Sequence, residues 1–158
     1  LRTIPGVQKR TAEILIAEIG IDMSVFPTAG HLASWAGQCP GNDQSAGKRR
    51  SGRTRKGSKH LNAALTDAAM AALRTNDSYL QALYRRKKPA LGHARALGVI
   101  KHSMLCAAWH MLSTGELYND LGADYFARRD PERTTKRLVA QLERLGHTVN
   151  LEQAPIAA

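Results

Sequence analysis

Apolar residues recur at helical spacing through most of this chain, and this periodicity constrains the fold more than any other feature. Residues 9–19, 58–74 and 89–112 each place apolar side chains three or four positions apart, which marks the buried face of an α-helix. Alternation of polar and apolar residues is confined to residues 147–151, and a single short strand cannot form a sheet. The pattern therefore predicts an all-α domain.

Helix boundaries are expected at residues that cap helices or break them. Glycine commonly follows the last helical residue, so Gly20, Gly37, Gly115 and Gly146 are expected to end helices. Short polar side chains favour the N-cap position. The expected N-caps are Thr28, Ser58, either Asn76 or Asp77, and Asp130. Pro89 is expected to open the longest helix, because proline is tolerated in the first turn.

Residues 38–57 interrupt the helical pattern with a long, basic, glycine-rich loop. Seven lysines and arginines fall between Lys48 and Lys59, and no acidic residue occurs between Gln44 and Thr66. A serine hydroxyl among guanidinium groups in an open loop is the arrangement that phosphoryl transfer by a serine nucleophile requires. The same composition is typical of a solvated loop, or of one that contacts nucleic acid without catalysis, so the residues alone leave both interpretations open.

A tight turn, Ile4-Pro5-Gly6-Val7, directly precedes the helix over residues 9–19. Such a turn presents backbone N–H groups and the positive end of a helix, which suit a phosphate oxygen. The turn resembles the second half of a helix-hairpin-helix motif, although Gln8 stands where that motif usually has a second glycine. Gly6 is therefore a candidate phosphate-binding residue, and a plain helix start is the alternative.

The charge balance favours a polyanionic partner. The chain has 23 Lys and Arg residues against 13 Asp and Glu residues, and its formal net charge of +10 points to nucleic acid or an anionic membrane surface. Aromatic residues make up 5% of the chain, so base stacking is not expected to be the main means of binding. A second acid-free stretch lies between Asp77 and Glu116. Its Arg85 and Arg86 are candidate nucleic-acid contacts, with a solvated helix face as the alternative.

Other classes of protein and site are disfavoured by the sequence. No segment has the run of about 20 apolar residues that a transmembrane helix needs, so we expect no membrane partner. Cys39 and Cys106 lie far apart and outside any C-x-x-C pair, which argues against a zinc site or disulfide framework and favours a reducing cytoplasm. The histidines of residues 93–110 lack i, i+4 spacing, so no metal site is expected in this chain. Trp35 and Trp109 lie on apolar faces and are expected in the core.

The order and spacing of the motifs resemble the C-terminal domain of the insertion-sequence 110/116/902 family of transposases. The resemblance covers residues 4–118. The matching segments, in chain order, are Ile4-Pro5-Gly6-Val7, Thr11-Ala12, residues 17–20, Phe26-Pro27, residues 31–37, Cys39-Pro40, residues 44–48, residues 53–57, Leu61 and Ala64-Leu65. An ordered series of this length is more specific than any single motif in it.

The resemblance implies a function that this chain would share with another domain. Members of the family join an N-terminal RuvC-like nuclease domain, which carries four metal-binding acids, to a serine-bearing domain. The serine attacks a DNA phosphate, a structured guide RNA directs recombination, and the nuclease domain supplies the metal that completes a composite active site. We therefore expect Mg²⁺ in the nuclease domain, DNA and a guide RNA as partners, a homo-oligomer, and a nucleoid-associated location in a prokaryotic cytoplasm. Because the chain lacks an initiator Met, we expect a fragment that is inactive in isolation.

Carried over by position, the resemblance implies that Ser45 is the nucleophile. The family usually has Ser-Gly at this point, whereas this chain has Ser45-Ala46-Gly47, which leaves Ser51 as an alternative. Basic residues of the loop are expected to contact phosphates. They are Lys48, Arg49, Arg50, Arg53, Arg55 and Lys56.

The chain is expected to divide into three parts. These are a helix-hairpin-helix-like segment at residues 1–20, a transposase domain at residues 21–118 with its serine loop at residues 38–57, and a C-terminal helix and tail at residues 119–158. Two alternative functions come from other classes. One is a non-catalytic nucleic-acid-binding module that uses the Gly6 turn and the two basic runs. The other is an oligomerisation module in which residues 61–73 and 91–112 pair between chains.

Overall fold

The computed structural model describes residues 1–41, 43–52 and 54–152, without the side chains of residues 43, 44 and 49–51. The chain forms two compact units, Leu1–Ala123 and Asp124–Ala158, which we treat separately. Among the helices described, none has the length and apolar character needed to cross a bilayer.

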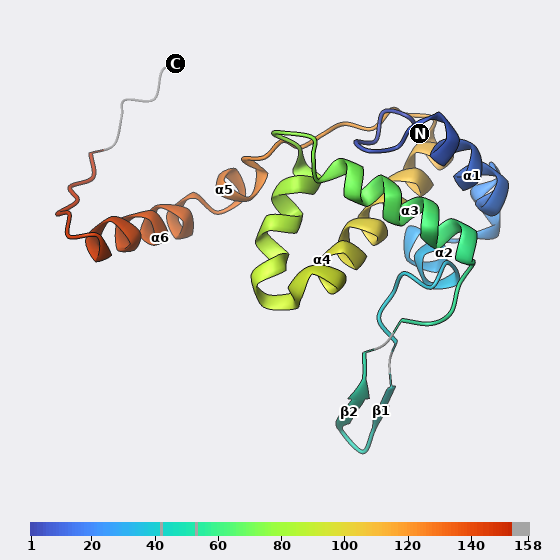
Figure 1. Ribbon diagram of the computed structural model, residues 1–158, viewed down its shortest axis with the longest axis horizontal. Helices are drawn as coiled ribbons and strands as arrows, with labels where there is room; N and C mark the ends of the chain where they lie inside the picture. The colour runs from blue at the N-terminus through green and yellow to red at the C-terminus, as the bar shows by residue number, and fades with distance from the viewer. Residues whose placement is uncertain (42, 53, 153–158) are drawn as a thin grey trace. The chain divides into compact units, whose positions relative to one another are not determined.

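The described chain is helical, which confirms the predicted fold class (Figure 1). The elements, in chain order, are α1 (Lys9–Ile19), a short 3-10 helix η1 (Met23–Val25), α2 (Ala29–Trp35), β1 (Asp43–Ser45), β2 (Lys48–Ser51), α3 (Lys59–Ala72), α4 (Tyr79–Thr114), α5 (Tyr125–Arg129) and α6 (Pro131–Arg144). Residues 147–151, where alternation allowed a strand, are not in one. The segment predicted as a loop without secondary structure contains the antiparallel pair β1–β2, which is a correction to that prediction.

Helices α3 and α4 pack against each other at the centre of the first unit, with α1 against α3 and α2 against α4. Its buried face combines Leu61 and Leu65 with alanines at positions 64, 68, 69 and 72. Burial of a leucine side chain contributes about 1.5–3 kcal/mol, and the alanines let neighbouring backbones come close. Residues 61–73 and 91–112 thus bury their apolar faces within one chain, including Ile100 and Leu105 of α4.

The turn before α1 packs directly on α3. Gly6 has φ +84°, and a Cβ built on it would lie 2.1 Å from the Ala68 carbonyl oxygen and 2.6 Å from the Ala72 nitrogen. No residue with a side chain fits at this contact. The glycine therefore serves the packing of the turn against α3, whatever else its backbone binds.

Most of the predicted helix caps are confirmed. The hydroxyls of Thr28 and Ser58 accept hydrogen bonds from the His31 and Leu61 amides, both at 3.3 Å, and the Asp130 carboxylate accepts one from the Arg133 amide at 3.2 Å. These bonds satisfy N–H groups that have no partner within the helix. Gly20 and Gly115 follow the last residues of α1 and α4, as expected.

Two boundaries near α4 differ from the prediction. The N-cap is Ser78, whose hydroxyl accepts from the Gln81 amide at 3.2 Å, whereas Asp77 adopts a positive φ of 55° in the turn before it. Pro89 lies inside the helix, and the helical path breaks three residues later at Gly92, with φ 74° and ψ 171°. Proline removes one helical hydrogen bond, and glycine is the residue that adopts the positive φ at low cost. The two halves of α4 consequently run in different directions (Figure 1).

Neither tryptophan lies in the buried core, where both are predicted. Trp35 is 51% exposed, so its predicted place in the core is wrong; its ring lies 5.5 Å from the Phe26 ring, centre to centre. Trp109 is half-buried, and its indole N–H donates to the Phe26 carbonyl oxygen at 2.9 Å.

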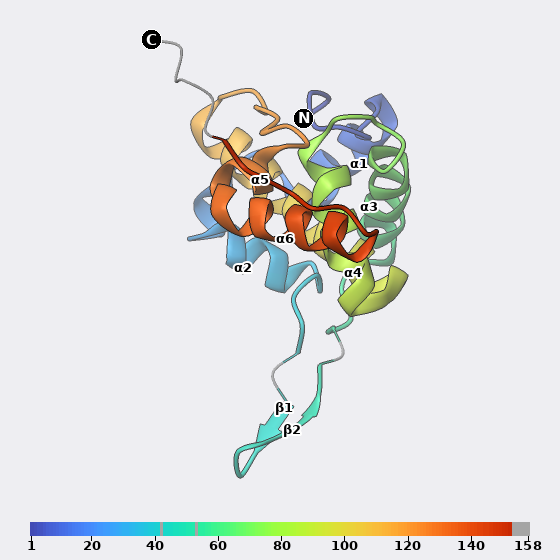
Figure 2. The same cartoon turned by 90° about the vertical axis from the view of Figure 1, so that its left-hand side faces the viewer.

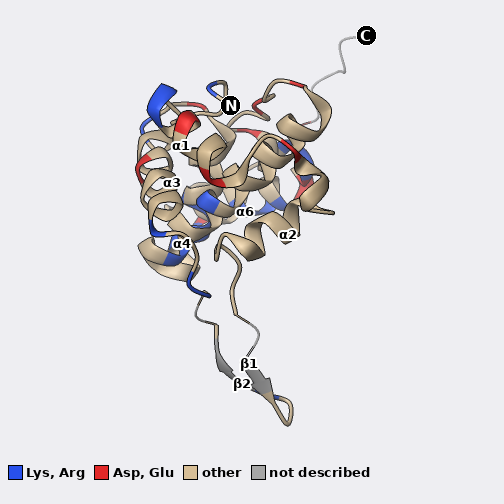
Figure 3. Ribbon diagram, turned by 90° about the vertical axis from the view of Figure 1, so that its right-hand side faces the viewer, with Lys and Arg blue, Asp and Glu red and all other residues tan. Residues whose placement is uncertain are grey.

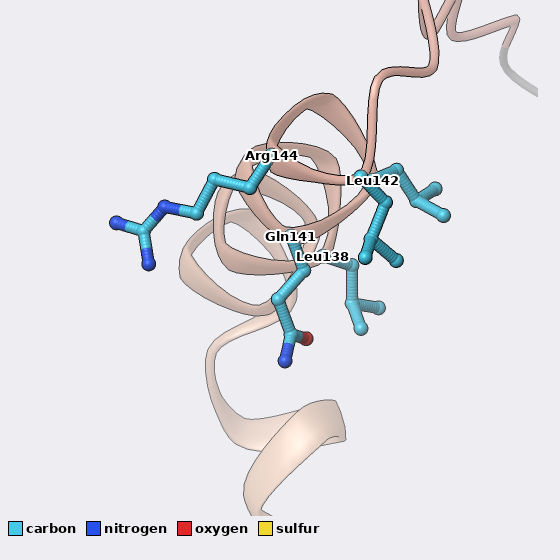
Figure 4. Close-up of a pocket in the computed structure, with 5 residues that line it drawn as sticks. Leu138, Gln141, Leu142 and Arg144 are labelled. Atoms are coloured by element: carbon cyan, nitrogen blue, oxygen red, sulfur yellow. The ribbon is translucent and has the colours of Figure 1, made fainter.

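The second unit carries α5 and α6. None of the residues of α6 is buried, and Leu138, Leu142 and Leu145 form an exposed apolar stripe along it. Figure 4 shows Leu138 and Leu142 on one side of α6, while Arg144 points away from them. The α6 helix is therefore strongly amphipathic.

The contact between Gly6 and α3 predicts a large effect of Gly6→Ala. We expect the substitution to lower the free energy of unfolding by about 2–4 kcal/mol, because the added methyl group overlaps the α3 backbone at a positive φ. Urea denaturation followed by circular dichroism measures the change. Gly98→Ala is the matched control, since a Cβ there meets nothing within 4 Å and the helical site favours alanine by about 0.5–1 kcal/mol. Equal stability of the two variants would contradict the packing role of Gly6.

Candidate nucleic-acid interface

The described part of residues 38–57, which are residues 38–41, 43–52 and 54–57, leaves the helical unit as an extended hairpin, which we refer to as the arm (Figure 2). In its antiparallel register, Gln44 pairs with Arg49 and Ser45 pairs with Lys48, with an irregularity between Asp43 and Gln44. Two residues connect the strands. Both have positive φ, 48° at Ala46 and 75° at Gly47, which is the signature of a type I′ turn.

The turn determines where Ser45 stands. Ser45 is the last paired residue of β1, it is exposed, and Lys48 faces it across the hairpin. Positive φ is unfavourable for alanine, so Ala46 is a strained choice for this position. The arm therefore presents one serine and one lysine side by side at its tip.

Further basic residues follow the arm back to the helices. Arg55 and Lys56 are exposed on the returning segment. Arg49 and Arg50 are on β2, but their side chains are not described, and Arg53 lies outside the described residues. The coloured part of the arm in Figure 3 carries basic segments and no acidic one. Of the predicted phosphate contacts, Lys48 lies with Ser45 at the tip of the arm, and Arg55 and Lys56 lie exposed on its returning side.

Two glycines hold the foot of the arm, where the chain leaves and returns. A Cβ on Gly57 would lie 2.2 Å from the Ala36 carbonyl oxygen, and a Cβ on Gly37 would lie 2.6 Å from the Arg55 carbonyl oxygen. The outgoing and returning backbones are therefore in direct contact. The sequence predicts only that Gly37 ends a helix. Its second role is this contact between backbones, and the sequence signal for it is Gly57, the glycine at the other end of the loop.

A polar cluster joins the foot of the arm to α3 and α4. The oxygen Asn62 Oδ1 accepts from Gln38 Nε2 at 3.1 Å and from Lys101 Nζ at 2.8 Å. Gln38 is buried, and burial lowers the pKa of Lys101 from its ordinary value. These three residues come from three separate elements, so the sequence alone did not group them.

The two cysteines, far apart in sequence, meet on either side of one imidazole. Cys39 Sγ lies 3.8 Å from His102 Nδ1, and Cys106 Sγ lies 3.5 Å from His102 Nε2. Both thiols are free, and burial, together with the nearby Cys39, raises the pKa of Cys106. The thiols approach opposite ring nitrogens, which does not suit a shared ion. In the described part of the chain, no group of three or more His, Cys, Asp and Glu side chains could hold a metal.

The second basic run lies on the first half of α4. Arg85 and Arg86 are exposed, and Lys88 lies 5.7 Å from the centre of the Tyr84 ring. The Tyr84 hydroxyl contacts His93 Nδ1 at 2.6 Å, across the break in the helix. Figures 1 and 2 place the bend of α4 at the same end of the first unit as the arm. The basic run is thus near the arm's end of the unit but on a different element.

The N-terminal turn is separate from the arm. Helix α1 has no side-chain cap and no acidic residue in its first turn, which instead begins with the exposed Lys9 and Arg10. Lys9 lies 3.9 Å from the Glu13 carboxylate, so Arg10 and the uncapped N–H groups of this turn are what suits an anion at the positive helix end. The structure does not bring Gly6 and Ser45 together: α1 and the arm lie toward opposite ends of the unit in Figures 1 and 2.

Comparison with known proteins gives the family. The family model described as Transposase IS116/IS110/IS902 family matches residues 1–85, more than half of the chain. The chain belongs to this transposase family. The match includes the N-terminal turn, the whole arm and α3.

A relative supports this membership. A Streptomyces coelicolor protein, described as the insertion element IS110 uncharacterized 43.6 kDa protein, is 32% identical to this transposase-family chain over 120 residues. The aligned region covers 75% of this chain and 29% of the relative, so the chain spans less than a third of the relative's length. No solved structure matches the chain.

The cysteine cluster predicts a distinctive alkylation profile. Because the thiolate is the nucleophile and the pKa of Cys106 is raised, we expect iodoacetamide to modify Cys106 more slowly in the folded chain than in urea, with a rate that climbs above the ordinary thiol pKa. Cys39→Ser should shift this rate profile toward lower pH, because it removes the smaller of the two causes that raise the pKa of Cys106. Peptide mass spectrometry across a pH series measures both. A Cys106 profile identical in folded and unfolded chains would contradict the cluster.

Proposed function

We propose that this chain is the DNA-binding, serine-bearing part of a transposase, and that Ser45 is the nucleophile that attacks a DNA phosphate. The observation that carries the proposal is the position of Ser45: exposed, at the tip of a basic arm, and paired with Lys48. Membership of the transposase family supports it. Phosphoryl transfer needs a reachable hydroxyl with cations around the phosphate, and the arm offers both.

The proposed step exchanges one ester for another. The Ser45 Oγ–P bond forms and a P–O bond of the DNA backbone breaks. The proton leaves the serine hydroxyl, and the departing deoxyribose oxygen takes up a proton. Negative charge grows on the phosphoryl oxygens during the step, and Lys48 is the cation beside them at the tip. Arg55, Lys56 and the arginines at positions 49, 50 and 53 are proposed to hold the flanking phosphates.

A partner domain belongs to this proposal. The residue paired with Ser45 is Lys48, which is a cation rather than a proton acceptor. We propose that an RuvC-like nuclease domain of the full-length protein supplies Mg²⁺ and the proton acceptor, so that the isolated chain is inactive. A structured guide RNA, a homo-oligomer and a nucleoid-associated place in the cytoplasm belong to the same proposal.

Other residues are proposed to bind the DNA away from the tip. Arg85 and Arg86 are exposed on α4, at the arm's end of the first unit. The Gly6 turn would bind a phosphate through the uncapped start of α1, with Lys9 and Arg10 beside it. That uncapped helix start also favours the second candidate function, a module that binds nucleic acid without catalysis.

Substitution of the two arm serines in the full-length protein separates these functions. We expect Ser45→Ala to abolish strand transfer, by roughly 10³-fold or more, and to abolish the covalent protein–DNA adduct while DNA binding is retained. Ser51→Ala is the matched control, because Ser51 is on the opposite strand of the same arm, and it should retain transfer. Adduct formation on a nicked substrate is read by denaturing gel electrophoresis.

Each other outcome assigns the function differently. Full transfer by Ser45→Ala with loss in Ser51→Ala would move the nucleophile to Ser51. Retention of transfer by both variants, or by the double variant, would leave DNA binding as the function of the arm.

A further inference from the structure

The cluster at the foot of the arm leaves the amide nitrogen of Asn62 as a hydrogen-bond donor that its two partners do not use. Asn62 Oδ1 already accepts from Gln38 and from Lys101. A lysine ammonium donates hydrogen bonds and accepts none, so the Asn62 atom that it contacts must be the oxygen. This fixes which end of the Asn62 side-chain amide faces Lys101. The Asn62 nitrogen, with two N–H donors, is then directed away from both partners, on an exposed residue.

Lys101 adds a cation with spare donors to this cluster. An ammonium has three N–H groups, and one of them is used by Asn62 at 2.8 Å. The ion pairs of the described residues involve other side chains, so no carboxylate there neutralises Lys101. The lysine is half-buried, and burial lowers its pKa. A partly desolvated cation attracts an anion more strongly than one surrounded by water.

The cluster is fixed at the point where the arm begins. Gln38 and Cys39 are consecutive, and they contact Asn62 and His102 respectively, beside Lys101. The backbone contact between Gly37 and Arg55 brings the returning side of the arm, with Lys56, to the same place. The returning side of the arm therefore leads its exposed cations toward Lys101, and no acidic residue occurs in the chain between Gln44 and Thr66.

We propose that Lys101 and Asn62 bind a backbone phosphate of DNA at the foot of the arm. The ligand class is a phosphodiester, whose anionic oxygens accept from an ammonium and an amide but donate to neither. The inference rests on the proposed function, since a DNA strand held by the arm's cations between its tip and the helices passes this cluster. The site adds Lys101 and the uncharged Asn62 to the proposed DNA contacts, and both residues lie outside the basic loop.

Asn62→Asp separates phosphate binding from structural support. The aspartate keeps an oxygen for Gln38 and Lys101 but replaces the outward N–H donors with a negative charge. We expect the full chain carrying this substitution to bind a labelled DNA duplex about tenfold more weakly at low salt, and its plot of log affinity against log salt to be shallower by about 0.9, the value for one lost phosphate contact. Asn76→Asp, an exposed site in the α3–α4 turn with the same change of charge, should weaken binding less than about twofold.

A second measurement needs no substitution. On saturation with the DNA duplex, the pKa of Lys101, lowered by burial in the free chain, should rise because a phosphate favours the charged form. The lysine side-chain NMR signal followed across pH measures this shift. Thermal unfolding of each variant in parallel shows whether it folds as the unsubstituted chain does; if Asn62→Asp does not, the Lys101 titration decides the inference.

The outcomes distinguish this inference from the proposed function. Equal loss of affinity in Asn62→Asp and Asn76→Asp, or an unmoved Lys101 pKa, overturns the phosphate site and leaves the proposed function intact. An effect seen with an RNA duplex and not with DNA overturns the assignment to DNA. Failure of the unsubstituted chain to bind DNA, or binding that is flat against salt, overturns the DNA-binding function itself.

Discussion

The close packing of backbone against α3 is the constraint on which the rest of the first unit depends. Alanines at positions 68, 69 and 72 leave room for the Gly6 turn on one side and for α4 on another. A larger side chain on this face would push the neighbouring elements outward, because protein interiors have little free volume. With α3 placed in this way, its first turn carries Asn62 to the foot of the arm.

The arm depends on a different kind of interaction. It is a two-stranded hairpin with few apolar residues, and such a hairpin has little stability of its own. Its position is set at its foot, by the backbone contact of Gly37 and Gly57 and by the side chains of Gln38 and Cys39. A rigid foot and an exposed tip together suit a segment that carries a reactive hydroxyl to a bound strand. The proposed phosphate site would make the foot part of the binding surface as well as a support.

Local signals account for most of what could be predicted. The start of α3 at Ser58 and that of α6 after Asp130 follow from side chains that bond to amides three residues away, so a short stretch of sequence contains the whole interaction. The β1–β2 hairpin was missed because its strands are polar and its turn, Ala46-Gly47, is not one of the usual Asn-Gly or Asp-Gly pairs. The break in α4 was placed at Pro89 rather than Gly92, since proline can remain inside a helix when the chain bends nearby.

The helical class, most of the helix ends, the basic character of residues 38–57 and membership of a transposase family can all be predicted from the amino-acid sequence, because periodicity, capping and motif order are properties of neighbouring residues. The packing of the chain places Ser45 at the tip of a paired hairpin, leaves Trp35 exposed, and brings Gln38 and Lys101 to the same Asn62 oxygen. The shared oxygen joins residues 24 and 39 positions apart, and the contact of Cys39 with His102 beside it joins residues 63 positions apart. Contacts of that span depend on how helices pack, and no local pattern encodes them.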